Sequence, residues 1–303
     1  MSAAAVDSSN KAATSPSSCA ACGITEGDDI KLKNCTACYL VKYCGVKCQK
    51  DHRKQHKQTC KKRAAELRDE LLFKQPESTH LGDCPICCLP LSLDMNKSTL
   101  YSCCSKFVCD GCVDANEERE AEGGIEHTCP FCRSSMPSSK EESDKRRMKR
   151  VEANDPVAMS HLGVEKIREG KFTIAFELFT KAAELGDVEV HYLLSNVYHH
   201  GHGVEKDRGK KIYHLEQAAI GGHPAARYNL GCEEWNNGDK ERAVKHLKIA
   251  AMQGDDNAIK ALIKEFKKGN LDKKDLDAAL RAHKAAVDAT KSPQREAAAA
   301  AGI

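Results

Sequence analysis

Apolar residues in the second half of the chain recur at steps of 32 to 36 residues. Leu162, Leu194, Leu230 and Leu262 mark the period. Three alanine pairs recur with these leucines, and each is followed three residues later by a glycine: Ala182-Ala183 and Gly186, Ala218-Ala219 and Gly222, Ala250-Ala251 and Gly254. A unit of this length holds two helices and two turns. The pattern therefore predicts four helix pairs stacked as a solenoid over residues 155–289.

The residues at the predicted ends of these units are also typical of helix caps. Asp155-Pro156 is typical of an N-cap followed by proline in the first turn, and His223-Pro224 repeats the proline placement with a poorer cap. The periodic glycines suit the left-handed position after a helix. They also argue against the alternative of one long coiled coil. A stacked solenoid exposes a surface suited to binding another protein.

The first half of the chain shows helical periodicity only over residues 61–75. There Ala64, Leu67, Leu71 and Leu72 share one face, and Pro76 follows. The remaining boundaries follow from composition, because polar or charged segments separate and flank the cysteine-rich blocks and the predicted repeats. We expect a disordered tail over 1–18, a helical linker over 61–83, a charged linker over 134–154 and a disordered tail over 290–303.

Charge and hydropathy exclude some functions. The net charge is only +3, which argues against a dedicated nucleic-acid binder. The chain has no apolar run of about 18 residues, so no membrane span is expected. Residues 42–63 carry nine basic residues against one acid, which is a solvated face or a partner surface. The KRRMKR run that ends at Arg150 is either a nuclear localisation sequence or a solvated linker.

Cysteine spacing indicates metal binding in the first half of the chain. Sixteen of the 17 cysteines lie between Cys19 and Cys132, mostly as pairs separated by two residues. With His56 they give each of two blocks eight donors, enough for two tetrahedral zinc ions per block and four in the chain. A disulfide framework is the alternative. The small, polar start of the chain has no secretory apolar segment, which favours a reducing compartment, cytoplasmic or nuclear.

The run KYCGVKCQKDHRKQHKQTC resembles the MYND zinc finger, with the resemblance covering residues 19–60. The resemblance implies two interleaved sites, with His52 as a possible substitute for His56: Cys19, Cys22, Cys44 and Cys48 in site one, and Cys35, Cys38, His56 and Cys60 in site two. It also implies binding of short proline-rich peptides, in which Gln49 would take part. Arg53 stands where relatives often carry a tryptophan of that peptide surface.

The CPIC and CPFCR motifs resemble a RING finger over residues 84–133, in an all-cysteine variant. The cross-brace of that family implies two more sites: Cys84, Cys87, Cys109 and Cys112 in site three, and Cys103, Cys104, Cys129 and Cys132 in site four. Lys106 stands where most RING fingers have a histidine ligand, so Cys104 is expected to ligate, with His127 as an alternative donor. Cys88 is surplus, a free or buried thiol.

By the same resemblance, Ile86 and Pro130 would form a shallow apolar patch that docks a ubiquitin-conjugating enzyme. Arg133 would contact both that enzyme and ubiquitin, because its planar fork can hydrogen-bond two partners. The chemistry would be positioning of the donor thioester, and no catalytic residue of this chain is expected. RING modules without ligase activity also exist.

The segment LLSNVYHHGHGVEKDRGKKIYHLEQAAIGG resembles the Sel-one-like repeats, relatives of the tetratricopeptide repeats. The expected fold class is therefore multidomain, with two small zinc-stabilised cross-brace modules followed by an all-α helical-repeat solenoid. His199, His200 and His202 form either a metal cluster or a solvated turn, and Cys232 is expected in the core.

Three functions fit these features. The first is a RING-type ubiquitin ligase that recruits partners through the repeats and the MYND-like finger. The second is a non-enzymatic scaffold, and the third is a transcriptional co-regulator.

Overall fold

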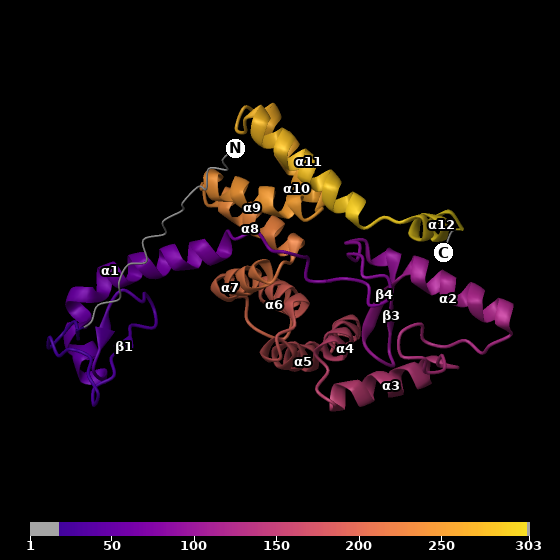
Figure 1. Cartoon of the computed structure of the whole chain (residues 1–303), viewed down its shortest axis with the longest axis horizontal. Helices are drawn as coiled ribbons and strands as arrows, with labels where there is room; N and C mark the ends of the chain where they lie inside the picture. The colour runs from indigo at the N-terminus through magenta and orange to yellow at the C-terminus, as the bar shows by residue number, and fades with distance from the viewer. Residues whose placement is uncertain (1–17, 302–303) are drawn as a thin grey trace, which may run out of the picture. The chain divides into compact units, whose positions relative to one another are not determined.

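A computed structural model describes residues 18–301, in two compact units divided between Leu72 and Phe73. The predicted disordered tail over residues 1–18 lies outside the described residues, except for Ser18. The first unit contains a short hairpin and a long helix (Figure 1): β1 (Lys33–Asn34) pairs antiparallel with β2 (Lys42–Tyr43), and α1 (Val46–Leu72) follows.

Helix α1 corrects the boundary predicted between the finger and a separate helix. The helix expected over 61–75 is the second half of α1, which already begins at Val46 and ends at Leu72. The reason is that Cys48, His56 and Cys60 lie on the same helix, so the last donors of the finger and the predicted linker share one backbone. The small core of this unit consists mostly of donors and their neighbours: Cys19, Leu32, Cys35, Cys38 and Tyr43.

The second unit begins with a hairpin followed by a helix. Strand β3 (Ser98–Tyr101) follows the short helix η1 (Met95–Lys97) and pairs antiparallel with β4 (Lys106–Cys109), which leads directly into α2 (Asp110–Gly123). In this register Ser98 faces Cys109. The core beneath the hairpin is again rich in sulfur: Cys84, Leu91, Tyr101, Val108, Cys109, Cys112, Val113 and Cys129.

The segment predicted as a charged linker, residues 134–154, is helical over its second half, which forms α3 (Lys140–Glu152). The Ser139 hydroxyl accepts from the Glu142 amide at 3.2 Å, and the Glu142 carboxylate accepts from the Ser138 amide at 2.8 Å, a variant of the capping box that satisfies two free amides at the helix start. Arginines of the basic run then pair with carboxylates: Arg146 with Glu142, Arg147 with Asp144 and Glu165, and Arg150 with Asp155.

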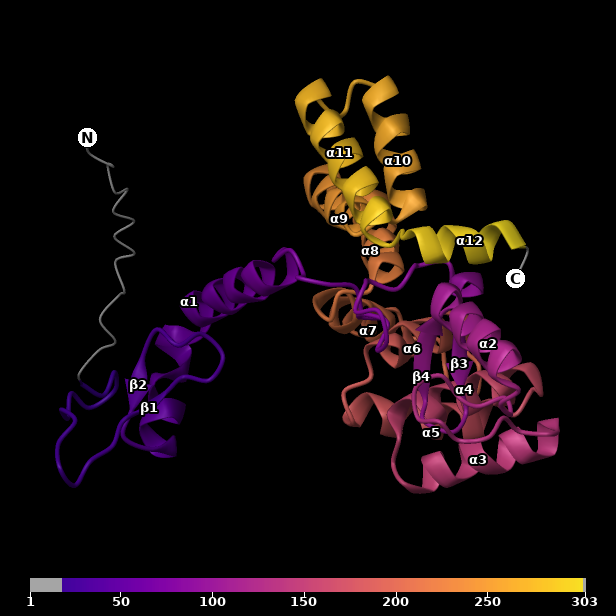
Figure 2. The same ribbon diagram turned by 45° about the vertical axis from the view of Figure 1, so that its right-hand side comes forward.

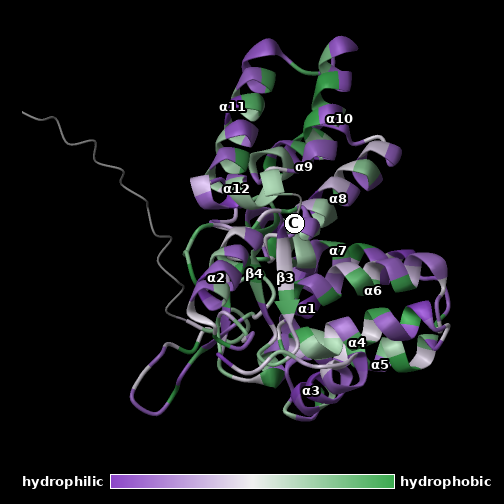
Figure 3. Cartoon of the chain, turned by 90° about the vertical axis from the view of Figure 1, so that its right-hand side faces the viewer, coloured by the Kyte–Doolittle hydropathy of each residue, from purple (hydrophilic) through white to green (hydrophobic). Residues whose placement is uncertain are grey.

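The repeats form four consecutive helix pairs, as predicted. Their bounds are α4 (Pro156–Arg168) with α5 (Phe172–Glu184), α6 (Val188–His200) with α7 (Arg208–Ile220), α8 (Pro224–Asn236) with α9 (Lys240–Met252), and α10 (Asp256–Lys267) with α11 (Lys273–Ala289). The first helix of each pair is capped by the equivalent residue: Asp155, Asp187, His223 and Asp255. Apolar and polar positions alternate along these helices (Figure 3).

Small residues allow the helices of the solenoid to approach closely. Ala182, Ala218 and Ala250 are fully buried, and the glycine after each pair has a positive φ, for example 86° at Gly222. The expectation that Cys232 lies in the core is wrong, because this thiol is exposed. The packed face of α8 runs through Gly231, and the next position turns toward solvent.

The predicted helical linker over 61–83 is helical only to Leu72. Residues 73–80, which we call the strap, lie against the repeats without helical structure. At its start the Phe73 ring packs on the His246 ring, with 4.7 Å between the ring centroids. The strap is therefore part of the packed second unit.

Backbone hydrogen bonds fix the strap further along. The Lys74 carbonyl accepts from the Arg227 guanidinium at 3.1 Å, and the His80 amide donates to the Gly222 carbonyl at 3.1 Å. A Cβ at Gly222 would lie 2.7 Å from the Ser78 carbonyl oxygen, so the strap needs glycine there. This face of the repeats thus binds a segment of main chain in cis.

The disordered tail predicted over 290–303 is also wrong for the described residues, which form helix α12 (Pro293–Ala301) against α2 (Figure 2). A Cβ at Gly111 would lie 2.8 Å from the Arg295 amide nitrogen, which shows how closely the two helices approach. The Arg295 guanidinium donates to Cys87 Sγ at 3.2 Å. The alanine-rich composition of this segment was interpreted as disorder, although the segment forms a helix packed on α2.

Replacing Gly163 in α4 by alanine should destabilise the repeats. Its Cβ would lie 2.4 Å from Cε1 of the buried Phe179 ring, and overpacking of this kind costs about 1–3 kcal/mol against a gain of roughly 1 kcal/mol in helix propensity. Thermal unfolding of the full chain would show a lower midpoint for Gly163→Ala.

The matched control is Gly209→Ala near the start of α7. Gly209 is exposed, and an added methyl there meets only the Asp207 carboxylate, at 3.3 Å. An unchanged or raised midpoint is expected for this variant. If both variants unfolded at the wild-type temperature, the close packing of α4 on α5 would be contradicted.

Candidate metal centres

The structure brings the sixteen predicted metal donors together in four groups. Within each group the donor atoms all lie within 4.8 Å of one another: Cys19, Cys22, Cys44 and Cys48; Cys35, Cys38, His56 and Cys60; Cys84, Cys87, Cys109 and Cys112; Cys103, Cys104, Cys129 and Cys132. Close Sγ–Sγ separations run from 3.3 to 3.9 Å. Tetrahedral zinc with bonds of about 2.3 Å needs an edge of about 3.8 Å. These separations exceed the disulfide length of about 2.05 Å.

In the first unit the two groups interleave along the chain. The loop pair Cys19/Cys22 meets Cys44, just before α1, and Cys48 in its first turn, with Cys22 Sγ 3.7 Å from Cys44 Sγ. The pair around β1 meets donors further along α1, where Cys38 Sγ lies 3.2 Å from His56 Nε2. His56 and Cys60 are four residues apart and therefore share one face of the helix.

His52, the alternative to His56, supports the site without joining its donor group. Its Nδ1 lies 3.1 Å from the Tyr43 hydroxyl, and its ring stacks on the His56 ring at 5.7 Å with an interplanar angle of 10°. Tyr43 also meets the His56 ring edge-on. The two aromatic neighbours fix the orientation of the His56 imidazole, as groups around a metal ligand commonly do.

The second unit places its donors at the ends of its elements. Cys103 and Cys104 occupy the turn between β3 and β4, and Cys109 and Cys112 span the start of α2. The first and third pairs meet, with Cys87 Sγ 3.7 Å from Cys109 Sγ. The second and fourth pairs meet at the other end.

The adjacent cysteines of the β3–β4 turn both take part in the fourth group. Cys104 Sγ lies 3.9 Å from Cys129 Sγ, and Cys103 Sγ lies 3.3 Å from Cys132 Sγ. The alternative donor His127 is outside this group, because its Nδ1 lies 3.1 Å from the buried Glu120 carboxylate.

Four of the cysteine pairs share one backbone turn. In each pair the amide of the residue just after the second cysteine donates to the carbonyl of the first cysteine at 2.9 Å, and that residue has a positive φ: Gly23 (76°), Tyr39 (58°), Cys88 (55°) and Arg133 (61°). The turn aims both sulfurs to one side. It also explains the surplus Cys88, which occupies the left-handed position of its turn and is exposed.

Thiol acidity within a group is uneven. Backbone hydrogen bonds from Cys22 and Cys44 lower the pKa of Cys19 to about 6, whereas the hydrogen bond to the Cys44 thiol raises the pKa of Cys48 to about 12. Once one thiolate forms, its neighbours hold their protons because a second negative charge is repelled. A divalent cation at the centre would remove that repulsion and release the remaining protons.

The predicted partner-binding residues lie in different environments. Ile86 is 41% exposed, but Pro130 is buried and cannot contribute to an exposed patch, whereas its neighbour Phe131 is 43% exposed. Arg133 is exposed and donates from Nη1 to Asn116 Oδ1 at 2.7 Å. Gln49 is exposed on α1.

Several groups around these centres could not be found from sequence pattern alone. Asn116 and Glu120 are buried on α2 and bond the backbone of Thr128, next to a donor of the fourth group. Arg295 reaches Cys87 from α12, far along the chain. His80, Glu189 and His223 also converge, and only the fold brings them together.

The histidine turn of the second repeat does not form a donor group. The rings of His200 and His202 stack at 5.2 Å, and His202 also stacks on Phe172. His200 Nδ1 lies 2.9 Å from the Asn196 carbonyl oxygen. The rings therefore pack against one another instead of turning their nitrogens toward a common point.

Two known families match parts of the chain. Residues 19–60 match the MYND finger, and residues 158–187, 188–223 and 224–255 match the Sel1 repeat. The chain thus has an N-terminal zinc-finger region followed by a Sel1-repeat solenoid, which confirms the predicted fold class. With its four tetrads of thiols and imidazole, it is a zinc-binding chain with about four sites.

Individual relatives cover only parts of the chain. The mouse (Mus musculus) protein DAP3-binding cell death enhancer 1 is 26% identical over 180 residues, which is 46% of this chain and 35% of the mouse protein. The chain thus spans about a third of the length of this relative.

Two solved structures are similar to parts of this chain. A Sel1 repeat protein from Oxalobacter formigenes matches 40% of this chain and 96% of its own at 26% identity and a TM-score of 0.36. A protective antigen of uropathogenic Escherichia coli with an SLR fold matches 52% of this chain and 35% of its own at 24% identity and a TM-score of 0.38. Among residues 18–301, the helices are too short or too polar to cross a membrane.

Native mass spectrometry of reduced protein should find four zinc ions per chain. Cys104→Ala should leave three, because the fourth group then has only three thiols, whereas the control His127→Ala should keep four. The opposite pattern, with zinc lost only in His127→Ala, would contradict the donor set of the fourth group.

Cys88→Gly should stabilise the second unit without loss of zinc. A left-handed residue other than glycine costs roughly 1–2 kcal/mol, so relief of that strain should raise the thermal midpoint by a few degrees. Cys88→Ala removes the thiol but keeps the strained φ, and it should show no such gain. Loss of one zinc in both variants would instead make Cys88 a ligand.

Proposed function

We propose that this chain is a RING-type ubiquitin ligase that docks a ubiquitin-conjugating enzyme on residues 84–133 and recruits partners through its repeats. The observation that carries the proposal is the interleaving of the third and fourth donor groups. Pairs one and three meet, and pairs two and four meet, around a hairpin and helix α2. We assign all sixteen donors as zinc ligands in these four sets.

The proposed chemistry is positioning. Ile86 is exposed on the turn of the CPIC motif, where it can contact a conjugating enzyme. Phe131 offers exposed apolar surface on the turn of the CPFCR motif, in place of the buried Pro130. Holding the donor thioester in one geometry lowers the entropic part of the barrier to transfer. This chain needs no nucleophile of its own for that step.

Arg133 is the residue best placed to act on the bound pair. Arg133 occupies the left-handed position just after Cys132, and its Nη1 donates to Asn116 Oδ1 at 2.7 Å. A guanidinium has five N–H donors, so a bond to Asn116 leaves donors for the conjugating enzyme and for ubiquitin. Asn116 acts here as a positioning residue.

The other modules would supply docking surfaces. The MYND-type finger presents Gln49 and the exposed Tyr39 and Val46 for a peptide, and the repeats over 155–289, including the fourth pair α10–α11, would bind a substrate or adaptor. Unpaired cysteines fit a reducing compartment, so we place the protein in the cytosol or nucleus.

A non-enzymatic scaffold is the second candidate, and the burial of Pro130 favours it. A docking patch reduced to Ile86 and Phe131 would bind a conjugating enzyme weakly. In that case the same zinc modules would serve as rigid adaptor surfaces.

Discharge of ubiquitin-loaded conjugating enzymes to free lysine separates these candidates. With an active partner from a panel, Ile86→Ala should weaken both binding and discharge, because it removes the exposed apolar contact. Arg133→Ala should slow discharge by about tenfold or more, the effect of losing a charged hydrogen bond, while binding measured by calorimetry changes little.

The matched control is Arg119→Ala, because Arg119 donates to the same Asn116 Oδ1, at 3.1 Å, but comes from α2 and not from the position just after the last cysteine. Discharge should stay at the wild-type rate in this variant. Failure of every conjugating enzyme to discharge faster with the protein than without it would exclude the ligase and leave the scaffold.

A further inference from the structure

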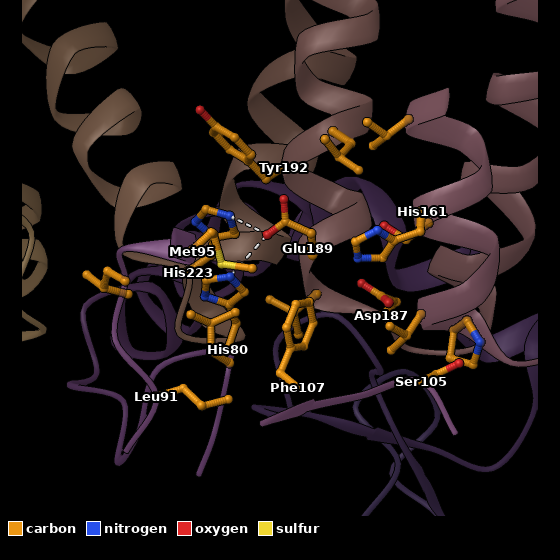
Figure 4. A pocket seen from close by; sticks show the side chains of 18 of the residues that line it. His80, Leu91, Met95, Ser105, Phe107, His161, Asp187, Glu189, Tyr192 and His223 are labelled. Atoms are coloured by element: carbon orange, nitrogen blue, oxygen red, sulfur yellow. Dashed lines mark hydrogen bonds and ion pairs between the residues drawn. The ribbon is translucent and has the colours of Figure 1, made fainter. Parts of the chain in front are cut away.

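A cavity of about 800 Å³ lies within the second unit, between the hairpin region and the repeats (Figure 4). One wall is apolar and carries Leu91, Met95 and Phe107. The facing wall comes from the starts of helices α4, α6 and α8 and carries Glu189 and Tyr192. The cavity adjoins the place where the strap crosses Gly222.

Two imidazoles hold the Glu189 carboxylate at this cavity. His80 Nε2 and His223 Nε2 each lie 3.0 Å from the same oxygen, Glu189 Oε2, as the dashed lines in Figure 4 mark. His223 Nδ1 accepts from the Ala226 amide at 3.3 Å, so the proton of that ring is on Nε2 and points at the carboxylate. Burial opposes ionisation, but the bonds from His223 and His80 keep the pKa of Glu189 well below its usual range.

His80, Glu189 and His223 lie close enough to be considered as metal ligands, but the ring geometry excludes an ion bound by both histidines. The His80 and His223 rings stack with centroids 4.0 Å apart and an interplanar angle of 11°. An ion in the plane of one ring would stand about 3–4 Å from the plane of the other, whereas a Zn–N bond is about 2.0–2.1 Å and lies in the ring plane. The arrangement is that of a hydrogen-bonded carboxylate.

Glu189 and the exposed Asp83 are the carboxylates left available to a ligand, and only Glu189 is held in place by two imidazoles. The cavity wall carries five carboxylates and two fixed cations: Asp83, Glu165, Asp187, Glu189 and Asp255 against Lys106 and Arg168. Asp187 and Asp255 cap helices, and Glu165 pairs with Arg147. The two imidazoles bond only one oxygen of Glu189, whose side chain is 41% exposed.

We infer that the cavity binds an extended peptide of a partner protein through a lysine or arginine side chain, with its charged head on Glu189 and its stem against Phe107 and Met95. Charge complementarity selects the basic side chain, and long basic side chains bury their stems on apolar surface. The strap shows that this face of the repeats already binds main chain, through the His80 amide and the Gly222 carbonyl. The inference rests on the proposed recruitment role of the repeats and does not depend on ubiquitin transfer.

Fluorescence anisotropy with labelled hexapeptide pools tests this inference on the zinc-loaded full chain. The pools share Leu, Phe, Ala and Ser at the flanking positions and carry Arg, Lys, norleucine or Glu at one central position. Wild-type protein should bind the Arg and Lys pools about tenfold more tightly than the norleucine pool, the value of one charge-assisted hydrogen bond. Glu189→Gln should reduce that preference to within about twofold, since the amide keeps an acceptor for the imidazoles but loses the charge.

Glu184→Gln is the matched control, because it removes the same charge from an exposed position at the end of α5 and should keep the preference. The comparison between pools on wild-type protein stands even if Glu189→Gln lowers the thermal midpoint. Equal binding of the basic and norleucine pools would overturn the inference. So would the absence of binding up to about 1 mM, an unchanged preference in Glu189→Gln, or a fifth zinc ion lost in that variant.

Discussion

Coordination of a divalent cation by groups of four thiols or imidazoles is the interaction on which residues 19–60 and 84–133 depend. The core cluster around the donors of the first unit has five buried residues, three of them candidate ligands, and the core beneath the β3–β4 hairpin of the second unit is similar in kind. Apolar burial on this scale cannot offset the entropy of ordering the loops around it. Metal binding supplies that free energy, and it also fixes which loops meet.

The second unit joins a zinc module to a helical solenoid without a flexible connection. The strap is bonded to the repeats, α3 is tied to α4 by ion pairs, and α12 returns to cover α2. A partner bound to the repeats would therefore be held at a defined distance from the CPIC and CPFCR turns. For a ligase this restriction would favour transfer to a limited set of lysines, and for a scaffold it would set the spacing of two clients.

The features that depend on short-range sequence patterns could be predicted from the sequence. Donor spacing indicated the zinc groups, and the recurring leucines, alanines and glycines predicted the helix pairs, because each residue's role is set within one turn or one repeat. Long-range packing decided the rest. The alanine-rich tail gives no hint that Arg295 reaches Cys87, and the burial of Pro130 depends on neighbours outside its motif. Likewise His80 and His223 lie 143 positions apart, and only the stacking of the strap on the repeats brings them to Glu189.

Hydrogen exchange of the full chain before and after complete removal of zinc tests the central claim most directly. We expect amides over residues 19–60 and 84–133 to lose protection when the metal is stripped, because few other contacts order those loops, while the helices from α4 to α9 keep theirs. Full protection of both zinc modules in metal-free, reduced protein would contradict this account.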